Sequence, residues 1–194
     1  MPTKSGERKD QILRVLAEML EGPCAGKIPT AALAAELGVS EAALYRHFAS
    51  KAQMFEGLIG FIEKTLFSLI NQLTAEEKSG IRQVEGILSL LLGFAKKNPG
   101  MTRVLIGDAL INENERLQTR INQLHDRLEA TLKQALRFAV SGGEIAVNLD
   151  VSAQANLLMC YIAGRWHQFA KSGFKRDPME YWKAQCRELL STAH

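Results

Sequence analysis

The sequence predicts an all-α protein of about nine helices, in which a small N-terminal three-helix head precedes a larger helical body. Apolar residues recur at helical spacing in almost every segment, and we find no convincing alternation of apolar and polar residues that would indicate a strand. Glycine and proline residues interrupt this pattern where loops between helices are expected. The predicted division places the head at residues 6–67 and the body at residues 68–194.

The composition is that of a globular protein that can bury a sizeable core, with 194 residues, 46% of them hydrophobic and 23% charged. The net charge of +3 is too small to indicate nucleic-acid binding by itself. Residues 1–10 contain no apolar signal core, and the longest apolar runs are too short to span a bilayer, so a cytoplasmic location is predicted. Cys24, Cys160 and Cys186 are scattered, which favours reduced thiols over a disulfide frame or a metal site.

The first helix is predicted over about residues 8–20. The first fourteen residues carry four basic side chains against the acids Glu7 and Asp10, and could form an arm that follows the DNA backbone or be only a solvated terminus. The basic residues are Lys4, Arg8, Lys9 and Arg14.

Residues 30–51 have the features of a helix-turn-helix, which we place at 29–48. Thr30 is expected to cap the first helix, Gly38 to end it in a left-handed conformation, and Ser40 to cap the second helix. The apolar spacing leaves one face of the second helix near the surface, with the residues Glu41, Ala42, Ala43, Tyr45, Arg46 and His47. The second helix of such a motif enters the major groove. Ala42 and Ala43 are small enough for a close approach to bases, and Tyr45, His47 and Lys51 carry phosphate-binding donors, so DNA binding is favoured over an ordinary helical hairpin.

The body is predicted to contain six further helices. Ser50 begins a long helix that extends to about Leu73 and joins the head to the body, and helices at about 81–97 and 101–110 follow, on either side of Asn98-Pro99-Gly100. The longest helix, at about 113–140, repeats leucine and isoleucine at nearly heptad spacing, as in a coiled coil. The last two are expected at about 150–172 and 177–192.

The helix near residues 153–170 is apolar on almost all sides between Ala155 and Gly164. We therefore expect a second copy of the chain to cover it, with a wholly internal core helix as the alternative. The predicted dimer interface consists of Leu157, Tyr161, Gly164, Trp166 and Trp182. A symmetric dimer would hold two recognition helices about 34 to 36 Å apart, which suits a palindromic DNA site.

Residues 8–51, which end in Gly38-Val39-Ser40-Glu41-Ala42-Ala43-Leu44-Tyr45-Arg46-His47-Phe48 and Ser50-Lys51, resemble the TetR family of dimeric bacterial regulators. The body is similar, in residues 90–94, 98–105 and 115–124, to a branch of that family that acts in nucleoid occlusion. The resemblance implies DNA contacts by Thr30, Ser40, Ala42, Ala43, Tyr45, His47 and Lys51. Pro29 departs from the pattern, since a polar residue is expected there, and a phosphate contact at that position would be absent.

Proteins of that branch bind chromosomal palindromes as dimers and block ring assembly by the division protein FtsZ, so the resemblance implies a nucleoid-associated FtsZ inhibitor, with one or several dimers at each DNA site. A groove between the fourth and fifth helices would take the C-terminal tail of FtsZ. The candidate contacts are Phe61, Leu90, Gly93, Phe94, Lys97 and Asn98, with core packing as the alternative for Leu90 and Phe94.

A transcriptional repressor released by a small-molecule effector is the second hypothesis, because that behaviour is the commoner one in the family. It needs a ligand pocket in the body, which His125, Tyr161, Arg165 and His167 could line. An enzyme is not predicted, because no nucleophile, glycine-rich cradle or metal-binding histidine pattern is recognisable. We expect no cofactor, no small-molecule ligand and no membrane partner.

Overall fold

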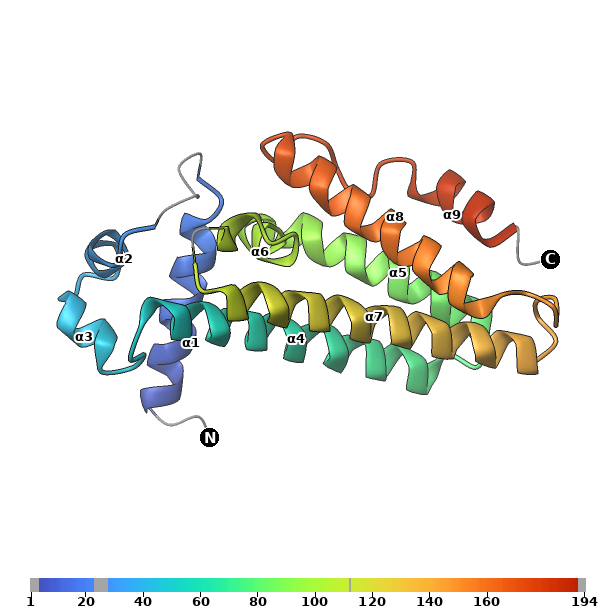
Figure 1. Ribbon diagram of the computed structural model, residues 1–194, viewed down its shortest axis with the longest axis horizontal. Helices are drawn as coiled ribbons and strands as arrows, with labels where there is room; N and C mark the ends of the chain where they lie inside the picture. Colours follow the sequence, from blue (N-terminus) through green and yellow to red (C-terminus); the bar gives the residue numbers. More distant parts are fainter. Residues whose placement is uncertain (1–3, 23–27, 112, 192–194) are drawn as a thin grey trace. The chain divides into compact units, whose positions relative to one another are not determined.

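A computed structural model of the chain describes residues 4–22, 28–111 and 113–191, and within these ranges all regular structure is helical (Figure 1). This confirms the predicted fold class. The helices are α1 (Lys4–Met19), α2 (Thr30–Glu36), α3 (Glu41–Tyr45), α4 (Lys51–Glu76), α5 (Gly80–Lys97), α6 (Pro99–Leu105), the 3-10 helix η1 (Asp108–Leu110), α7 (Glu115–Ser141), α8 (Val151–Lys171) and α9 (Trp182–Ser191).

The chain forms two compact units that are interleaved in sequence. The head unit comprises residues 1–63 and 98–121, and the body unit comprises residues 64–97 and 122–194. The sequence-based division used a single cut after residue 67. The structural units differ from it because α6, η1 and the start of α7 pack with the N-terminal helices.

The head unit is held together by contacts between its two chain segments. Helix α6 lies so close to α1 that a Cβ atom on Gly100 would be 1.9 Å from the carbonyl oxygen of Ala17, so no side chain fits there. Farther along the chain, the Arg120 guanidinium of α7 lies 3.4 Å from the carboxylate of Glu63 in α4. Ile12 and Leu16 of α1, and Leu20 directly after it, are buried in the core of this unit, as their spacing predicts.

In the body unit, α5 packs against α8 and α9. Trp166 of α8 is completely buried, and its Nε1–H donates a hydrogen bond to the carbonyl oxygen of Leu91 at 3.2 Å. Its ring also lies 5.8 Å from that of His125 in α7. The prediction that Trp166 belongs to a dimer interface is therefore wrong, because this side chain joins α8 to the core of its own subunit.

The two cysteines within the described residues, Cys160 and Cys186, are free thiols, as predicted. Burial raises the pKa of the Cys186 thiol to about 11, so this thiol is protonated at neutral pH. Cys24 lies outside the described residues.

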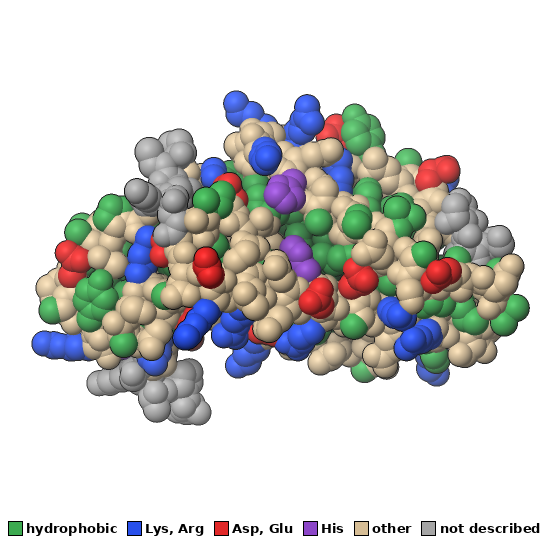
Figure 2. All heavy atoms as spheres, in the orientation of Figure 1, with side chains coloured by type: hydrophobic (Ala, Val, Ile, Leu, Met, Phe, Trp, Pro, Cys, Tyr) green, Lys and Arg blue, Asp and Glu red, His purple; other side chains and the backbone are tan. Residues whose placement is uncertain are grey.

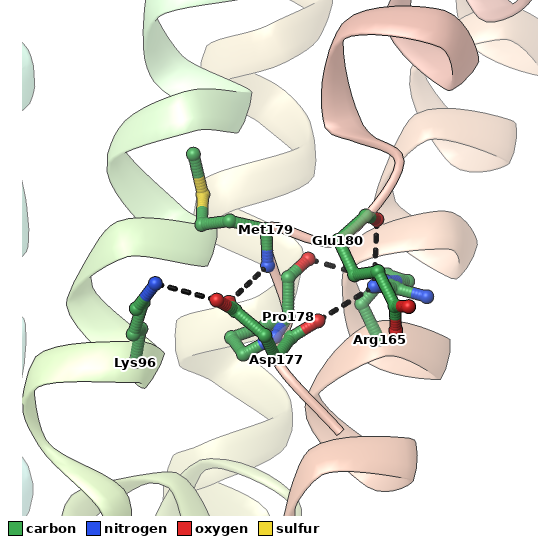
Figure 3. Close-up of polar contacts among 6 residues, drawn as sticks. All are labelled: Lys96, Arg165, Asp177, Pro178, Met179 and Glu180. Atoms are coloured by element: carbon green, nitrogen blue, oxygen red, sulfur yellow. Dashed lines mark hydrogen bonds and ion pairs between the residues drawn. The ribbon is translucent and has the colours of Figure 1, made fainter. Parts of the chain in front are cut away.

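Arg165 organises the loop between α8 and α9 (Figure 3). Its guanidinium donates to three carbonyl oxygens of the loop, those of Asp177, Pro178 and Glu180, at 2.8, 3.2 and 2.8 Å. The Asp177 carboxylate accepts from the Lys96 ammonium at 2.5 Å, and this bond holds the pKa of Asp177 below its usual value. Because the loop continues through these residues, α9 begins at Trp182, later than the predicted start at about 177.

Glu144, in the loop after α7, caps the N-terminus of α5 although it lies more than 60 residues away in sequence. Its carboxylate accepts hydrogen bonds from the Ser79 hydroxyl, from the Gly80 N–H at 2.7 Å and from the Ile81 N–H at 3.2 Å. These bonds, the one from Ser79 above all, lower the pKa of Glu144 below the ordinary glutamate value of 4.5.

We predict that Glu144→Gln lowers the free energy of unfolding at neutral pH by about 1 kcal/mol, a typical value for a lost helix cap. Because the folded-state pKa is depressed, the charged carboxylate stabilises the fold above pH 4.5, and this contribution is lost as the pH falls through the folded-state value. Urea unfolding of the wild type and the variant, at neutral pH and near pH 3, should show the stability difference narrowing in acid. A difference that does not change with pH would contradict the cap.

Candidate nucleic-acid interface and partner surfaces

The first helix of the helix-turn-helix, α2, is not capped by Thr30. Pro29 occupies the N-cap position, with φ −66° and without a side-chain cap. Thr30 is the first helical residue, and its hydroxyl donates to the Glu41 carboxylate of α3 at 2.6 Å. The predicted cap is therefore wrong, because the chain enters the helix one residue earlier, and Thr30 instead joins the two helices of the motif.

The turn between α2 and α3 confirms the other predicted features. Gly38 has φ +65°, a conformation that favours glycine, and the Val39 N–H closes the turn on the Ala34 carbonyl oxygen at 2.9 Å. Ser40 caps α3 by accepting from the Ala43 N–H at 3.3 Å. The side chains of Leu33, Leu44 and Phe48 are buried between the helices.

Helix α3 presents its opposite face to solvent. Tyr45 is 44% exposed, Ala42 and Arg46 are exposed, and Ala43 and His47 are half-buried. Small residues near the N-terminus of α3 leave room for a close approach, while Tyr45 and His47 supply hydrogen-bonding groups beside them.

Lys51, the first residue of α4, is paired with an acidic side chain of its own unit. Its ammonium lies 2.5 Å from the carboxylate of Glu113, and the two side chains are 27% and 14% exposed. The ammonium also lies 5.7 Å from the centre of the Phe55 ring. Sequence reasoning did not find this pair, because its members are 62 residues apart.

In the body unit, the predicted partner residues lie on α5. Leu90 lines a hollow of about 440 Å³ together with residues of the C-terminal part of α4, among them the exposed Leu69. Gly93 is half-exposed with open space above it, since a Cβ there would meet nothing within 4 Å. Lys97 is exposed at the end of the helix, seven residues after Leu90 and on the same face. Phe94 is only 8% exposed, so its predicted role as a contact is corrected to core packing.

The other two predicted partner residues, Phe61 and Asn98, belong to the head unit. They line a separate hollow of about 340 Å³, together with Asp10, Leu13, Arg14, Leu58 and Met101. Phe61 is 43% exposed, which is high for a phenylalanine.

Helix α8 keeps an apolar outer face, and Figure 2 shows hydrophobic side chains gathering over it. Leu157 is 48% exposed, and Gly164 is exposed with open space around it. Tyr161 is half-buried, and its hydroxyl donates to the Gln185 side chain of α9 at 2.9 Å. Trp182, only 9% exposed, lies against Tyr161 and contributes little surface, so its predicted interface role is corrected to packing between α8 and α9.

The four residues proposed for an effector pocket have different structural roles. His125 packs on Trp166, Arg165 binds the loop before α9, and Tyr161 binds Gln185. His167 is exposed and lines a hollow with residues at the end of α8. They therefore do not converge on one cavity.

Within the described part of the chain, no cluster of acidic, histidine or cysteine residues is arranged to hold a metal ion. None of its helices is long and apolar enough to cross a bilayer.

Comparison with known proteins identifies relatives of both parts of the chain. Residues 26–58 match the family of bacterial regulatory proteins of the tetR type, and residues 78–192 match the SlmA-like family described as a tetracyclin repressor-like C-terminal domain. The nucleoid occlusion factor SlmA of Marinomonas sp. (strain MWYL1) is 50% identical over 95% of this chain and 94% of its own length. The protein of the same name from Alteromonas mediterranea is 51% identical over 94% and 93%.

Solved structures share the fold at much lower identity. A TetR transcription regulator from Haloarcula marismortui superposes with a TM-score of 0.83 at 15% identity, over 96% of this chain and 98% of that one. The regulator FadR from Bacillus subtilis, in complex with stearoyl-CoA, superposes with a TM-score of 0.78 at 18% identity, over 95% and 99%.

Proposed function

The chain belongs to the SlmA-like branch of the TetR family, and we propose that it is a nucleoid occlusion factor, a dimer that binds palindromic DNA and inhibits FtsZ ring assembly over the chromosome. These are families of regulatory proteins, so the prediction that the chain is not an enzyme is confirmed. The observation that carries the proposal is the exposed face of α3 on a capped helix-turn-helix, in a chain that is about 50% identical over 95% of its length to a named nucleoid occlusion factor.

DNA binding rests on the chemistry of the α3 face. Ala42 and Ala43 permit close approach to base edges, while Tyr45, His47 and Ser40 offer groups that bind phosphate or base. Thr30 and Lys51 complete the proposed contact set at the ends of the motif, each in contact with a carboxylate.

Binding of the FtsZ tail is supported by the arrangement of α5. The hollow beside Leu90 is lined by three leucines, and also by Gln72, Glu76 and Glu77. Gly93 lets a peptide approach the helix backbone, and Lys97 places a positive charge one turn beyond. A peptide that places apolar side chains against the leucines and an acidic residue near Lys97, away from Glu76 and Glu77, fits this order of groups. Phe61 and Asn98 stay predicted contacts of the head unit.

Dimerisation is supported by the outer face of α8. A glycine in a helix interior destabilises the helix by about 1 kcal/mol relative to alanine, and nothing in the described part of the subunit requires Gly164 to lack a side chain. A second subunit that packs against Leu157 and Gly164 would explain why residue 164 is a glycine.

We predict that Tyr45→Ala weakens DNA binding at least tenfold at physiological salt, because an exposed hydrogen-bonding and stacking group is removed from the centre of the interface. Stability should change little, since Tyr45 is 44% exposed. Fluorescence anisotropy with a palindrome selected from genomic DNA measures the affinity. Tyr181→Ala is the matched control, because this tyrosine is 65% exposed and lies in the body unit. Equal affinities for both variants would argue against α3 as the recognition helix.

We predict that Gly93→Leu and Lys97→Glu abolish FtsZ antagonism and leave DNA affinity unchanged, since both positions lie in the body unit. Gly93→Leu should also stabilise the fold by about 0.5–1 kcal/mol, because it replaces an unconstrained helical glycine. FtsZ sedimentation with and without the selected DNA measures the effect. Lys64→Glu, an exposed charge reversal on α4, serves as the control. Full antagonism by Gly93→Leu would exclude this face.

We predict that Gly164→Leu yields a folded monomer, because the new side chain meets nothing in its own subunit but occupies the proposed interface. Analytical ultracentrifugation reports the oligomeric state, and thermal unfolding of the isolated variant reports its fold. A dimer as stable as the wild type would place the interface elsewhere.

A further inference from the structure

Two of the groups proposed to bind DNA already bind carboxylates in the DNA-free protein. The Thr30 hydroxyl donates to Glu41, and the Lys51 ammonium is paired with Glu113. Only the second contact is an ion pair, and its two side chains are more than 70% buried. A phosphate oxygen and a carboxylate oxygen make the same kind of bond to an ammonium group, so they compete for it.

We propose that Glu113 is an internal competitor of the DNA backbone, whose carboxylate neutralises Lys51 until a phosphate of the duplex displaces it. This inference rests on the proposed DNA-binding function. It adds Glu113 to the residues that control DNA affinity, although Glu113 itself does not contact the DNA and acts only through Lys51.

The position of Lys51 explains why a carboxylate is needed there. Lys51 is the first residue of α4, where the positive end of the helix dipole makes a further positive charge unfavourable. Glu113 offsets this cost in the free protein. A phosphate can do the same in the complex, with a full negative charge and additional oxygens that α4 N–H groups can reach.

Glu113 is held at the pair by its own segment, the turn between η1 and α7. Its N–H donates to the Leu110 carbonyl oxygen at 3.0 Å. The preceding elements are held by the ion pair between Arg103 of α6 and Asp108 of η1, at 3.2 Å, and by the close packing of α6 on α1 at Gly100. The backbone of Glu113 is therefore placed where its carboxylate reaches Lys51, and the carboxylate side chain is only 14% exposed.

Every DNA complex in which a phosphate binds Lys51 therefore loses the free energy of the pair between Lys51 and Glu113. A duplex whose phosphate fits the site poorly cannot displace Glu113, whereas a well-placed phosphate replaces the carboxylate fully. The pair thus weakens binding to the correct site by the free energy needed to break it, whereas a mismatched duplex leaves the pair intact and loses only the contact with Lys51. Glu113 is freed only when the correct site is bound.

The test is a double-mutant cycle with Lys51→Gln and Glu113→Gln, measured by fluorescence anisotropy on the selected palindrome and on a random-sequence duplex. We expect Glu113→Gln to tighten binding to the palindrome by about threefold, within the range measured for partly exposed ion pairs, because the pair no longer has to break. Binding to the random duplex should tighten less. Lys51→Gln should weaken binding and reduce the salt slope by about 0.9. In the Lys51→Gln background, Glu113→Gln should have no effect.

Glu115→Gln is the matched control, because Glu115 is an exposed acid two residues away. The change in DNA affinity caused by Glu115→Gln should be the same with and without Lys51, as expected for charge repulsion at a distance. Hydrogen exchange provides a second measurement. In the wild type, the backbone amide of residue 113 should exchange faster when the palindrome is bound than in the free protein. In the Glu113→Gln variant, the same amide should exchange fast in the free and in the DNA-bound protein.

Three outcomes would overturn the inference. Weaker binding by Glu113→Gln would mean that Glu113 positions Lys51 instead of competing for it. An equal gain in both Lys51 backgrounds would mean general repulsion of DNA. An unchanged affinity and salt slope for Lys51→Gln would mean that Lys51 touches no phosphate, while the comparison of Tyr45→Ala with Tyr181→Ala would still decide separately whether the head binds DNA.

Discussion

Helix α3 is five residues long, far below the length at which an isolated helix persists in water, so its conformation depends entirely on its surroundings. The left-handed Gly38 sets the direction in which the chain enters the helix, and the Ser40 hydroxyl satisfies one of its first N–H groups. Leu44 and Phe48 then fix its rotation by burying one side, which leaves Tyr45 on the other. The position of the proposed DNA-binding face therefore depends on this small core, on the left-handed turn at Gly38 and on the Ser40 cap.

The features that the sequence predicted well are those set by nearby residues. Helical periodicity located the helices, and the identities of Gly38, Ser40 and Ser50 were enough to place the turn and the start of α4, because such devices act within three or four residues. Contacts between distant segments were missed, among them the Glu144 cap and the pairing of Lys51 with Glu113. Nothing in a local pattern shows which carboxylate will reach which donor.

Apolar character also could not distinguish two kinds of burial. Trp166 and Leu157 lie on the same strongly apolar helix, yet Trp166 is sealed in the core of its own subunit and Leu157 is half-exposed. The glycines of α5 and α8 were more informative than the large residues. Gly80 must be glycine because the backbone of Ala139 lies against it, whereas Gly93 and Gly164 have open space above them. These two glycines therefore lie where the proposed partner and the proposed second subunit would approach the helices.

The interleaving of the two units has a consequence for how this fold can be divided. The head unit needs residues 98–121 as much as residues 1–63, and Gly100 seats that second segment directly on the backbone of α1. A continuous N-terminal fragment would therefore lack part of its own scaffold. Exchange of recognition modules between relatives, in evolution or by engineering, has to carry both pieces together, which ties the DNA-reading end of the chain to the stretch that leads into α7.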